Sequence, residues 1–122
     1  MTPEAALYQF WSGFGIPAYA ASSTPEDVQY PYITYELVVG EWGQGEVNTT
    51  VNVWYYTESE ALPNAKVREI GNAIGLGGTQ LRCDGGTLWI KKGSPWAQSV
   101  TSEGNTSIKR RYLNVDIEYQ TL

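Results

Sequence analysis

The chain has 122 residues, 42% of them hydrophobic, so it can bury the core of one domain over residues 1–122 and is too short for two. Its net charge of −5 argues against nucleic-acid binding, because proteins that bind nucleic acids carry basic surfaces that neutralise phosphates. The sequence has no histidine and one cysteine, so the commonest general base, the Ser–His and Cys–His nucleophile pairs and the ordinary structural zinc sites are excluded. Most enzyme classes therefore fail on residue inventory, and we expect a protein that needs no cofactor or metal.

The first predicted element is a helix over residues 2–13. Thr2 can cap it, and the spacing of Leu7 and Trp11 places both on one apolar stripe. The next residues, 14–29, favour turns. The sequence shows no signal peptide and no apolar run of about 18 residues, so we expect cytoplasmic synthesis and no membrane partner.

The stretch YPYITYELVV predicts a strand over residues 32–39 in which both faces are unusually apolar. One set of alternating side chains suits a core: Ile33, Tyr35, Leu37 and Val39. The other set comprises Tyr32, Thr34, Glu36 and Val38. Such a second face is odd in a monomer and indicates contact with another chain or with a channel wall.

A glycine-rich tip over residues 40–48 carries Trp42 and leads to a second predicted strand over residues 49–56. In this strand Val51, Val53 and Tyr55 share one face, and Trp54 and Tyr56 lie on the other. The two strands are expected to form a hairpin with a projecting loop.

The second half of the chain predicts one helix and three strands. Apolar residues recur at helical spacing over residues 59–74. The β segments cover residues 79–84, 86–92 and 108–120. Residues 93–106 read as a loop that presents Trp96.

The element order is therefore α-ββ-α-βββ. Two amphipathic helices each need one apolar face covered, and the economical solution is an α+β fold, a mostly antiparallel β-sheet with both helices packed on one face. The opposite sheet face should carry Tyr32, Glu36, Val38, Trp54, Tyr56, Tyr112, Asp116 and Glu118.

Asp116 and Glu118 share one strand face at about 6.5–7 Å, a separation that glycosidases also use for paired carboxylates. With aromatic rings nearby, two alternatives stay open: a small carboxylate-dependent hydrolase and a carbohydrate- or peptide-binding module that uses the aromatic face. A charged outer face balanced by basic neighbours explains the same pattern, and we favour that explanation because no feature requires a cleft.

The tryptophans at positions 42 and 96 would be costly to expose on loops, so each should fold back on its own domain or dock on a partner. The basic cluster Lys109-Arg110-Arg111 indicates a rim or subunit salt-bridge patch more than a phosphate site. Both features favour an assembly protein.

Several segments together point to a known family: IPAY with PYITYE, the strand VNVWYY, the block GGTQLRCDGGTLWIKKGSPWAQ over residues 77–98, and RRYLNVDIEY. The chain resembles small neck proteins encoded in siphophages and prophages of Gram-positive bacteria, in particular the tail-terminator (tail-completion) group. The resemblance runs over nearly the whole chain.

The resemblance implies a sheet with two helices on one face and a role without catalysis. Tail terminators assemble as rings, typically hexamers, on the head-proximal end of the tail tube, where they end polymerisation and join the tail to the head. The implied partners are further copies of the chain, the major tail-tube protein and head–tail connector proteins, and DNA would pass through without specific binding. A head-completion or connector protein of the virion neck remains an alternative.

A ring needs heterologous contacts, in which different patches of neighbouring subunits meet. The candidate residues for contacts with a neighbour or the tail tube are Tyr32, Val38, Trp42, Trp54, Tyr56, Trp96 and Arg110. An acidic channel would keep the DNA duplex from sticking. The candidate lining residues are Glu41, Glu46, Asp116 and Glu118.

Overall fold

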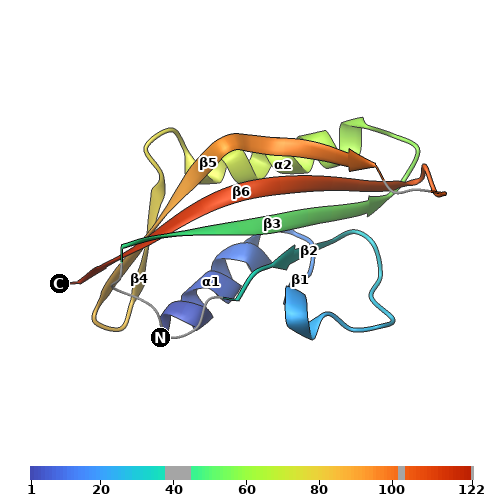
Figure 1. Ribbon diagram of the computed structural model, residues 1–122. Coiled ribbons are helices and arrows are strands. Elements are labelled where there is room, and N and C mark those ends of the chain that lie inside the picture. Colours follow the sequence, from blue (N-terminus) through green and yellow to red (C-terminus); the bar gives the residue numbers. More distant parts are fainter. Residues whose placement is uncertain (38–44, 102–103, 122) are drawn as a thin grey trace.

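The computed structural model describes residues 1–37, 45–101 and 104–121 (Figure 1). In chain order the elements are α1 (Pro3–Trp11), the 3₁₀ turn η1 (Ser12–Phe14), β1 (Ala18–Ala20), the 3₁₀ turn η2 (Ala21–Ser23), β2 (Tyr32–Tyr35), β3 (Glu46–Tyr56), α2 (Ala61–Ile74), β4 (Thr79–Cys83), β5 (Gly86–Thr101) and β6 (Ile108–Thr121).

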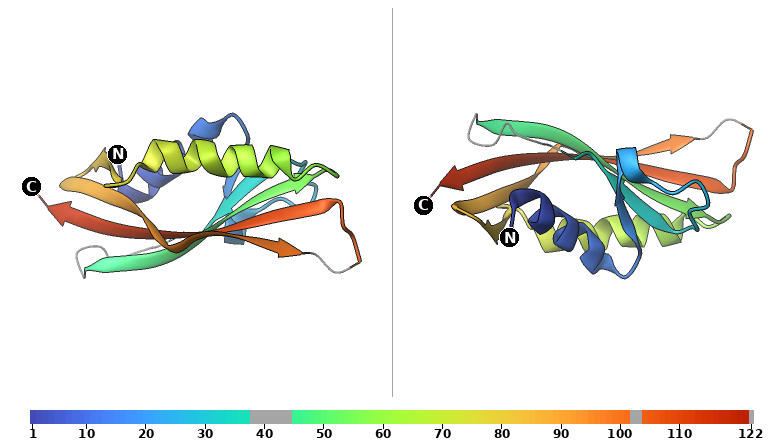
Figure 2. Two further views of the ribbon diagram at one scale, coloured as in Figure 1. Left: turned by 90° about the horizontal axis from the view of Figure 1, so that it is seen from above. Right: turned by 90° about the horizontal axis from the view of Figure 1, so that it is seen from below.

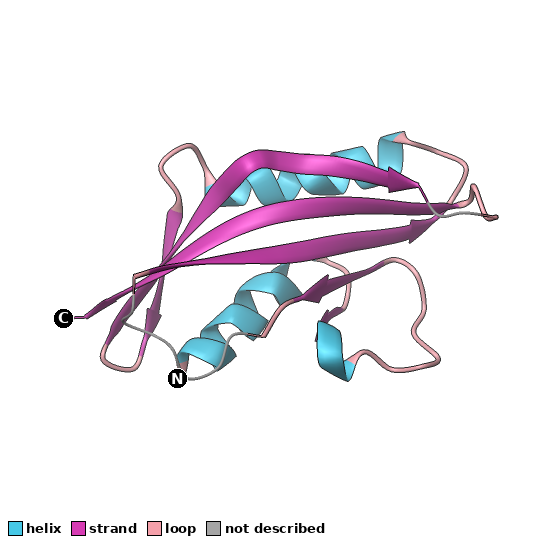
Figure 3. Ribbon diagram, in the orientation of Figure 1, coloured by secondary structure: helices cyan, strands magenta, loops and turns pink. Residues whose placement is uncertain are grey.

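The strands form one sheet in the order β1-β2-β3-β6-β5-β4. β1 and β2 run parallel, and each other neighbouring pair is antiparallel. The long strands β3, β6 and β5 form the middle of the sheet (Figure 3). Both α1 and α2 pack on the same sheet face (Figure 2), which we call the inner face. The predicted fold class, a mostly antiparallel α+β sheet with two helices on one face, is confirmed.

The core lies between the helices and the inner face of the sheet. α1 contributes Leu7 and Trp11, and α2 contributes Ile70 and Ile74, all at most 1% exposed. They meet fully buried strand residues that include Ile33, Val51, Val53, Leu88, Ile90, Leu113 and Val115. Burying each such side chain stabilises the folded state by about 1.5–3 kcal/mol. Both helices contribute side chains to this one core, which therefore holds them against the sheet.

Local signals fix the starts of both helices. The Thr2 hydroxyl accepts a hydrogen bond from the Ala5 backbone N–H at 3.0 Å, as predicted for the cap of α1. α2 begins at Ala61, and the Ser59 hydroxyl accepts from its N–H at 3.1 Å. Pro63 lies in the first turn of α2, where its missing N–H costs no helical hydrogen bond.

The predicted loop over residues 93–106 is wrong in its first part, because β5 continues to Thr101. Glycine and proline in the segment GSPW favoured a loop, but a β-bulge between Lys92 and Ala97 accommodates them within the strand. The Asn114 side-chain amide donates to the Pro95 carbonyl at 2.7 Å and ties the bulge to β6.

The first hairpin also differs from its predicted boundaries. β3 begins at Glu46, inside the segment assigned to the tip, and β1 was not predicted. Within residues 32–37, the last hydrogen bond to β3 is made by Glu36. The Glu36 backbone N–H donates to the Thr50 carbonyl at 3.2 Å. The strand alternation therefore ends before Leu37, which is 43% exposed, so its predicted place in the core is wrong. Val38 and Val39 lie outside the described residues.

Candidate assembly surfaces

The outer face of the sheet, opposite the helices, carries a row of side chains across β2, β3 and β6. We call Tyr32, Trp54, Arg110 and Tyr112 the aromatic row. Tyr32 in β2 and Arg110 in β6 are both register partners of Trp54, so they are its cross-strand neighbours on either side of β3. Tyr32 stacks on Trp54 with ring centroids 5.9 Å apart, and the Arg110 guanidinium lies 5.1 Å from the Trp54 ring and 5.7 Å from the Tyr112 ring.

Two hydrogen bonds hold the aromatic row in place. The Trp54 indole N–H donates to the Thr34 hydroxyl at 3.0 Å, and Arg110 Nε donates to Asn52 Oδ1 at 2.7 Å. No carboxylate of a described residue lies within 4.0 Å of the Arg110 guanidinium. The row is therefore a pre-ordered surface whose cation has no carboxylate partner among the described residues, a composition typical of protein interfaces.

Tyr32 lies on the outer face as predicted, but it is only 7% exposed in the single chain. Its ring is covered by Tyr30, Tyr19 and Trp54, and this burial, followed by the proximity of Tyr30, raises its pKa above the ordinary value. Tyr30 and Tyr56 lie beside it and are 37% and 59% exposed. These two rings, rather than Tyr32, offer aromatic area to a partner.

The other end of the outer face is acidic. Glu46, Asp116 and Glu118 gather there around Lys91, whose ammonium lies 2.5 Å from Glu46 Oε2 and 3.7 Å from Glu118 Oε1. The hydrogen bond that Lys91 donates to Glu46 raises the pKa of Lys91. Burial, followed by the nearby Glu46 charge, raises the pKa of Asp116, while Lys91 lowers it. Three carboxylates share one ammonium, so this acidic end repels anions. Three of the four predicted lining residues thus lie together on one surface.

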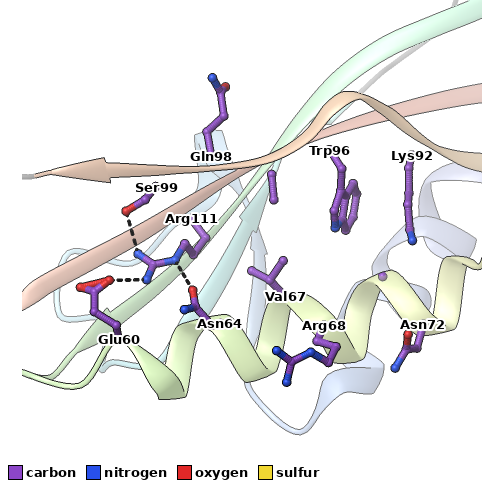
Figure 4. A pocket seen from close by; sticks show the side chains of 12 residues that line it. Glu60, Asn64, Val67, Arg68, Asn72, Lys92, Trp96, Gln98, Ser99 and Arg111 are labelled. Carbon is purple, nitrogen blue, oxygen red and sulfur yellow. Dashed lines mark hydrogen bonds and ion pairs between the residues drawn. The ribbon is translucent and has the colours of Figure 1, made fainter.

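A groove of about 570 Å³ lies between α2 and the second half of β5, and we call it the α2–β5 groove. Trp96 and Lys92 point from β5 toward α2 (Figure 4). Gly71 of α2 lies beneath them, and a Cβ at that position would meet Trp96 Nε1 at 3.4 Å and the Lys92 side chain at 3.5 Å. Asn64, Val67, Arg68 and Asn72 also line the helix side. Trp96 was predicted on a loop; it lies in β5 and lines this groove.

Arg111 closes one end of the groove and is 5% exposed. Its guanidinium donates to Asn64 Oδ1 at 2.9 Å, to Ser99 Oγ at 3.0 Å and to Glu60 Oε2 at 2.8 Å (Figure 4). The hydrogen bond that Arg111 donates to Glu60, together with the charges of Arg111 and Lys109, holds the pKa of Glu60 below its ordinary value. Arg111 therefore joins β6 to β5 and to the start of α2.

Some predicted site residues cannot be placed, and others were missed. Val38, Glu41 and Trp42 lie outside the described residues. Arg111 was predicted in a rim or subunit salt-bridge patch with Lys109 and Arg110, but it is buried and bonded within its own chain. Lys92 was not assigned a site role. The alternation of β6 could have indicated the role of Arg111, because it places Arg111 on the same face as buried Leu113. A charged side chain buried there needs a hydrogen-bonding partner.

Two further kinds of site are not found in the part of the chain that the structure describes. Residues 1–37, 45–101 and 104–121 contain no group of three or more His, Cys, Asp or Glu side chains arranged to hold a metal ion. None of the helices in these ranges has the length and apolar character needed to cross a membrane.

Comparisons with known proteins show a similar fold in a solved structure. No family model matches this chain, and no curated protein matches it. A solved structure described as "Virion of native gene transfer agent (GTA) particle" contains a chain with a similar fold, at a TM-score of 0.69 and 18% sequence identity. The match covers 97% of this chain and 94% of that chain. At this identity the likeness is one of fold, and it extends over essentially the whole of both chains.

Proposed function

We propose that this protein is a phage virion structural protein that forms a ring at the head-proximal end of the tail tube, ends tail polymerisation and joins the tail to the head. The observation that carries the proposal is the shared fold, over 97% of the chain, with a chain from the virion of a gene transfer agent particle. The resemblance of its sequence segments to tail terminators supports the same class. The protein would then act in the virion, without catalysis or cofactor.

The two ends of the outer face support this role. The aromatic row and the exposed rings of Tyr30 and Tyr56 suit contact with the tail-tube protein or a neighbouring copy. The acidic end, with Glu46, Asp116 and Glu118, suits a channel wall past which DNA moves without binding.

A head-completion or connector protein of the same neck is the second candidate. The neighbouring structure is described as a virion, which leaves the position of its chain in the particle open. A carbohydrate-binding module has less support, because Tyr32 already stacks on the Trp54 ring and the Arg110 guanidinium lies 5.1 Å from its centroid.

Loss of the protein from the particle that encodes it tests the role. A tail terminator predicts tails longer than normal and without heads, and supplying the wild-type chain should restore both length and heads. A connector role predicts tails of normal length that lack heads. Normal, infectious particles in the absence of the protein would contradict both candidates.

A further inference from the structure

The α2–β5 groove has the composition of a docking site for an acidic peptide segment. Arg68 and Lys92 lie on its two sides, and no carboxylate of a described residue lies within 4.0 Å of either cation. Between them, Val67, Gly71 and Trp96 form an apolar floor. The carboxylate of Glu60 also lines the groove, at the end closed by Arg111, which donates a hydrogen bond to it. Such a groove accommodates one apolar side chain flanked by carboxylates.

The backbone beside the groove is also unpaired. β4 covers β5 only from Gly86 to Ile90, so from Lys91 to Thr101 β5 has no strand partner on that side among the described residues. An exposed strand edge with an adjacent groove is a common site for an added chain segment. The bulge between Lys92 and Ala97 interrupts this edge, which favours a short segment over a long added strand.

A segment of complementary chemistry lies at the opposite edge of the sheet. Residues 24–29, which we call the acidic loop, have the sequence TPEDVQ and connect η2 to β2 on the β1 side (Figure 1). Glu26 and Asp27 are exposed, and no basic group of a described residue lies within 4.0 Å of their carboxylates. Pro25 and Val28 flank them, and the Val28 N–H donates to the Pro25 carbonyl at 3.4 Å.

The acidic loop cannot reach the groove of its own chain. The strand order places β1 four strand spacings from β5, roughly 19 Å at about 4.8 Å per spacing. A contact between them must therefore join two copies. Because the two patches differ and lie at opposite edges of one sheet, the contact is heterologous and propagates head to tail, as a ring or a filament.

We propose that the acidic loop of one copy docks in the α2–β5 groove of the next copy. Glu26 and Asp27 pair with Arg68 and Lys92, and Pro25 or Val28 covers the apolar floor beside Trp96. This contact deepens the proposed function, since it supplies the subunit interface of the ring. The aromatic row and the acidic end stay free for the tail tube and the channel.

Charge reversal in two separate variants tests the contact. One variant carries Glu26→Lys and Asp27→Lys, and the other carries Arg68→Glu and Lys92→Glu. In each variant alone the loop and groove repel, so the protein concentration at which rings or oligomers form should rise at least about tenfold. Mixed one to one, the two variants present complementary pairs wherever they alternate, so assembly should return in rings or filaments of alternating copies. Arg82 is an exposed cation on β4 with no carboxylate of a described residue within 4.0 Å, so Arg82→Glu is the matched control and should assemble normally.

Cross-linking locates the contact directly. A carbodiimide joins a carboxylate to a lysine amine in contact, so wild-type rings built from a mixture of unlabelled and ¹⁵N-labelled chains should give mixed-label peptides that link Glu26 or Asp27 to Lys92.

Several results would overturn the proposal: reversal variants that assemble like wild type, a mixture that fails to restore assembly, or assembled wild type without the cross-link to Lys92. A wild-type chain that never self-associates, alone or on tail tubes, would overturn it as well. The outcomes also separate the contact from the function. Rings with the cross-link that do not stop tube growth would contradict only the terminator role, and capped tubes without the cross-link would contradict only the contact.

Discussion

Arg111 in β6 donates a hydrogen bond to Glu60 at the start of α2, with Arg111 Nη2 and Glu60 Oε2 2.8 Å apart. The arginine is 5% exposed, whereas the Glu60 side chain is 61% exposed. The pair therefore has a desolvated cation and a hydrated anion, and the two other bonds of Arg111, to Asn64 and Ser99, complete its environment. The arrangement fixes α2 over the sheet and shapes one end of the α2–β5 groove.

Arg111→Ala should lower the free energy of unfolding by about 1–3 kcal/mol, because it removes three hydrogen bonds and a packed side chain from a buried position. The neighbouring Arg110→Ala is the control, since Arg110 lies on the partly exposed outer face and its ring contacts contribute roughly 0.5–1 kcal/mol each. Urea unfolding at neutral pH measures both. A smaller loss for Arg111→Ala than for Arg110→Ala would show that the three bonds do not anchor α2.

The same ion pair predicts a pH dependence. Arg111 holds the pKa of Glu60 below its ordinary value of 4.5, so the folded state binds this proton less readily than the unfolded state. The stabilisation is complete above pH 4.5 and is lost as the pH falls through the folded pKa. Wild type should therefore lose more stability than Glu60→Gln on acidification from neutral pH to below 4.5, as measured by urea midpoints along a pH series. Parallel curves for the two proteins would contradict the prediction.

Gly86 lies where β5 approaches the end of β6, and a Cβ there would overlap the backbone carbonyl oxygen of Gln120. Gly86→Ala should therefore disturb the pairing of the two strands and cost about 1–3 kcal/mol or more. A Cβ added at Gly13 would have no heavy atom within 4 Å, so Gly13→Ala should leave the stability unchanged or slightly raised. Thermal unfolding of the two variants compares them, and equal melting temperatures would show that β5 and β6 separate there easily.

Tyr56 and Tyr8 are exposed to similar extents, 59% and 54%, but Tyr56 lies beside the aromatic row and Tyr8 lies on α1. We expect Tyr56→Ala to leave the unfolding free energy within about 0.5 kcal/mol of wild type and to weaken capping of tail tubes severalfold. Tyr8→Ala should change neither property. Binding of each variant to purified tubes, measured by co-sedimentation, distinguishes them, and equal binding by Tyr56→Ala and wild type would remove this end of the outer face from the tube interface.

Periodicity in the sequence was sufficient to predict the fold class, because both helices and the main strands carry regular apolar patterns. It failed where a local signal competed with tertiary context. The proline and glycine near Trp96 favoured a loop, yet the bulge and pairing with β6 keep this segment in β5. The pattern of Leu37 predicted a core position, but the chain stops bonding to β3 before that residue.

The candidate surfaces were only partly predictable for a related reason. Alternation in single strands correctly placed Trp54, Asp116 and Glu118 on the outer face. It could not predict that β3 and β6 would pair in the register that puts Arg110 against Trp54, because register follows from the packing of the whole sheet. The α2–β5 groove depends on a bulge and on a helix far away in sequence, so no single segment signalled it.

The central claim is that the protein caps tail tubes as a ring. Electron microscopy of the major tail-tube protein polymerising with and without the purified chain tests it most directly. The account predicts ring-shaped density on one end of each tube and tubes that stop growing once the protein is added. Tubes that keep elongating, with bare ends at saturating amounts of the protein, would contradict it.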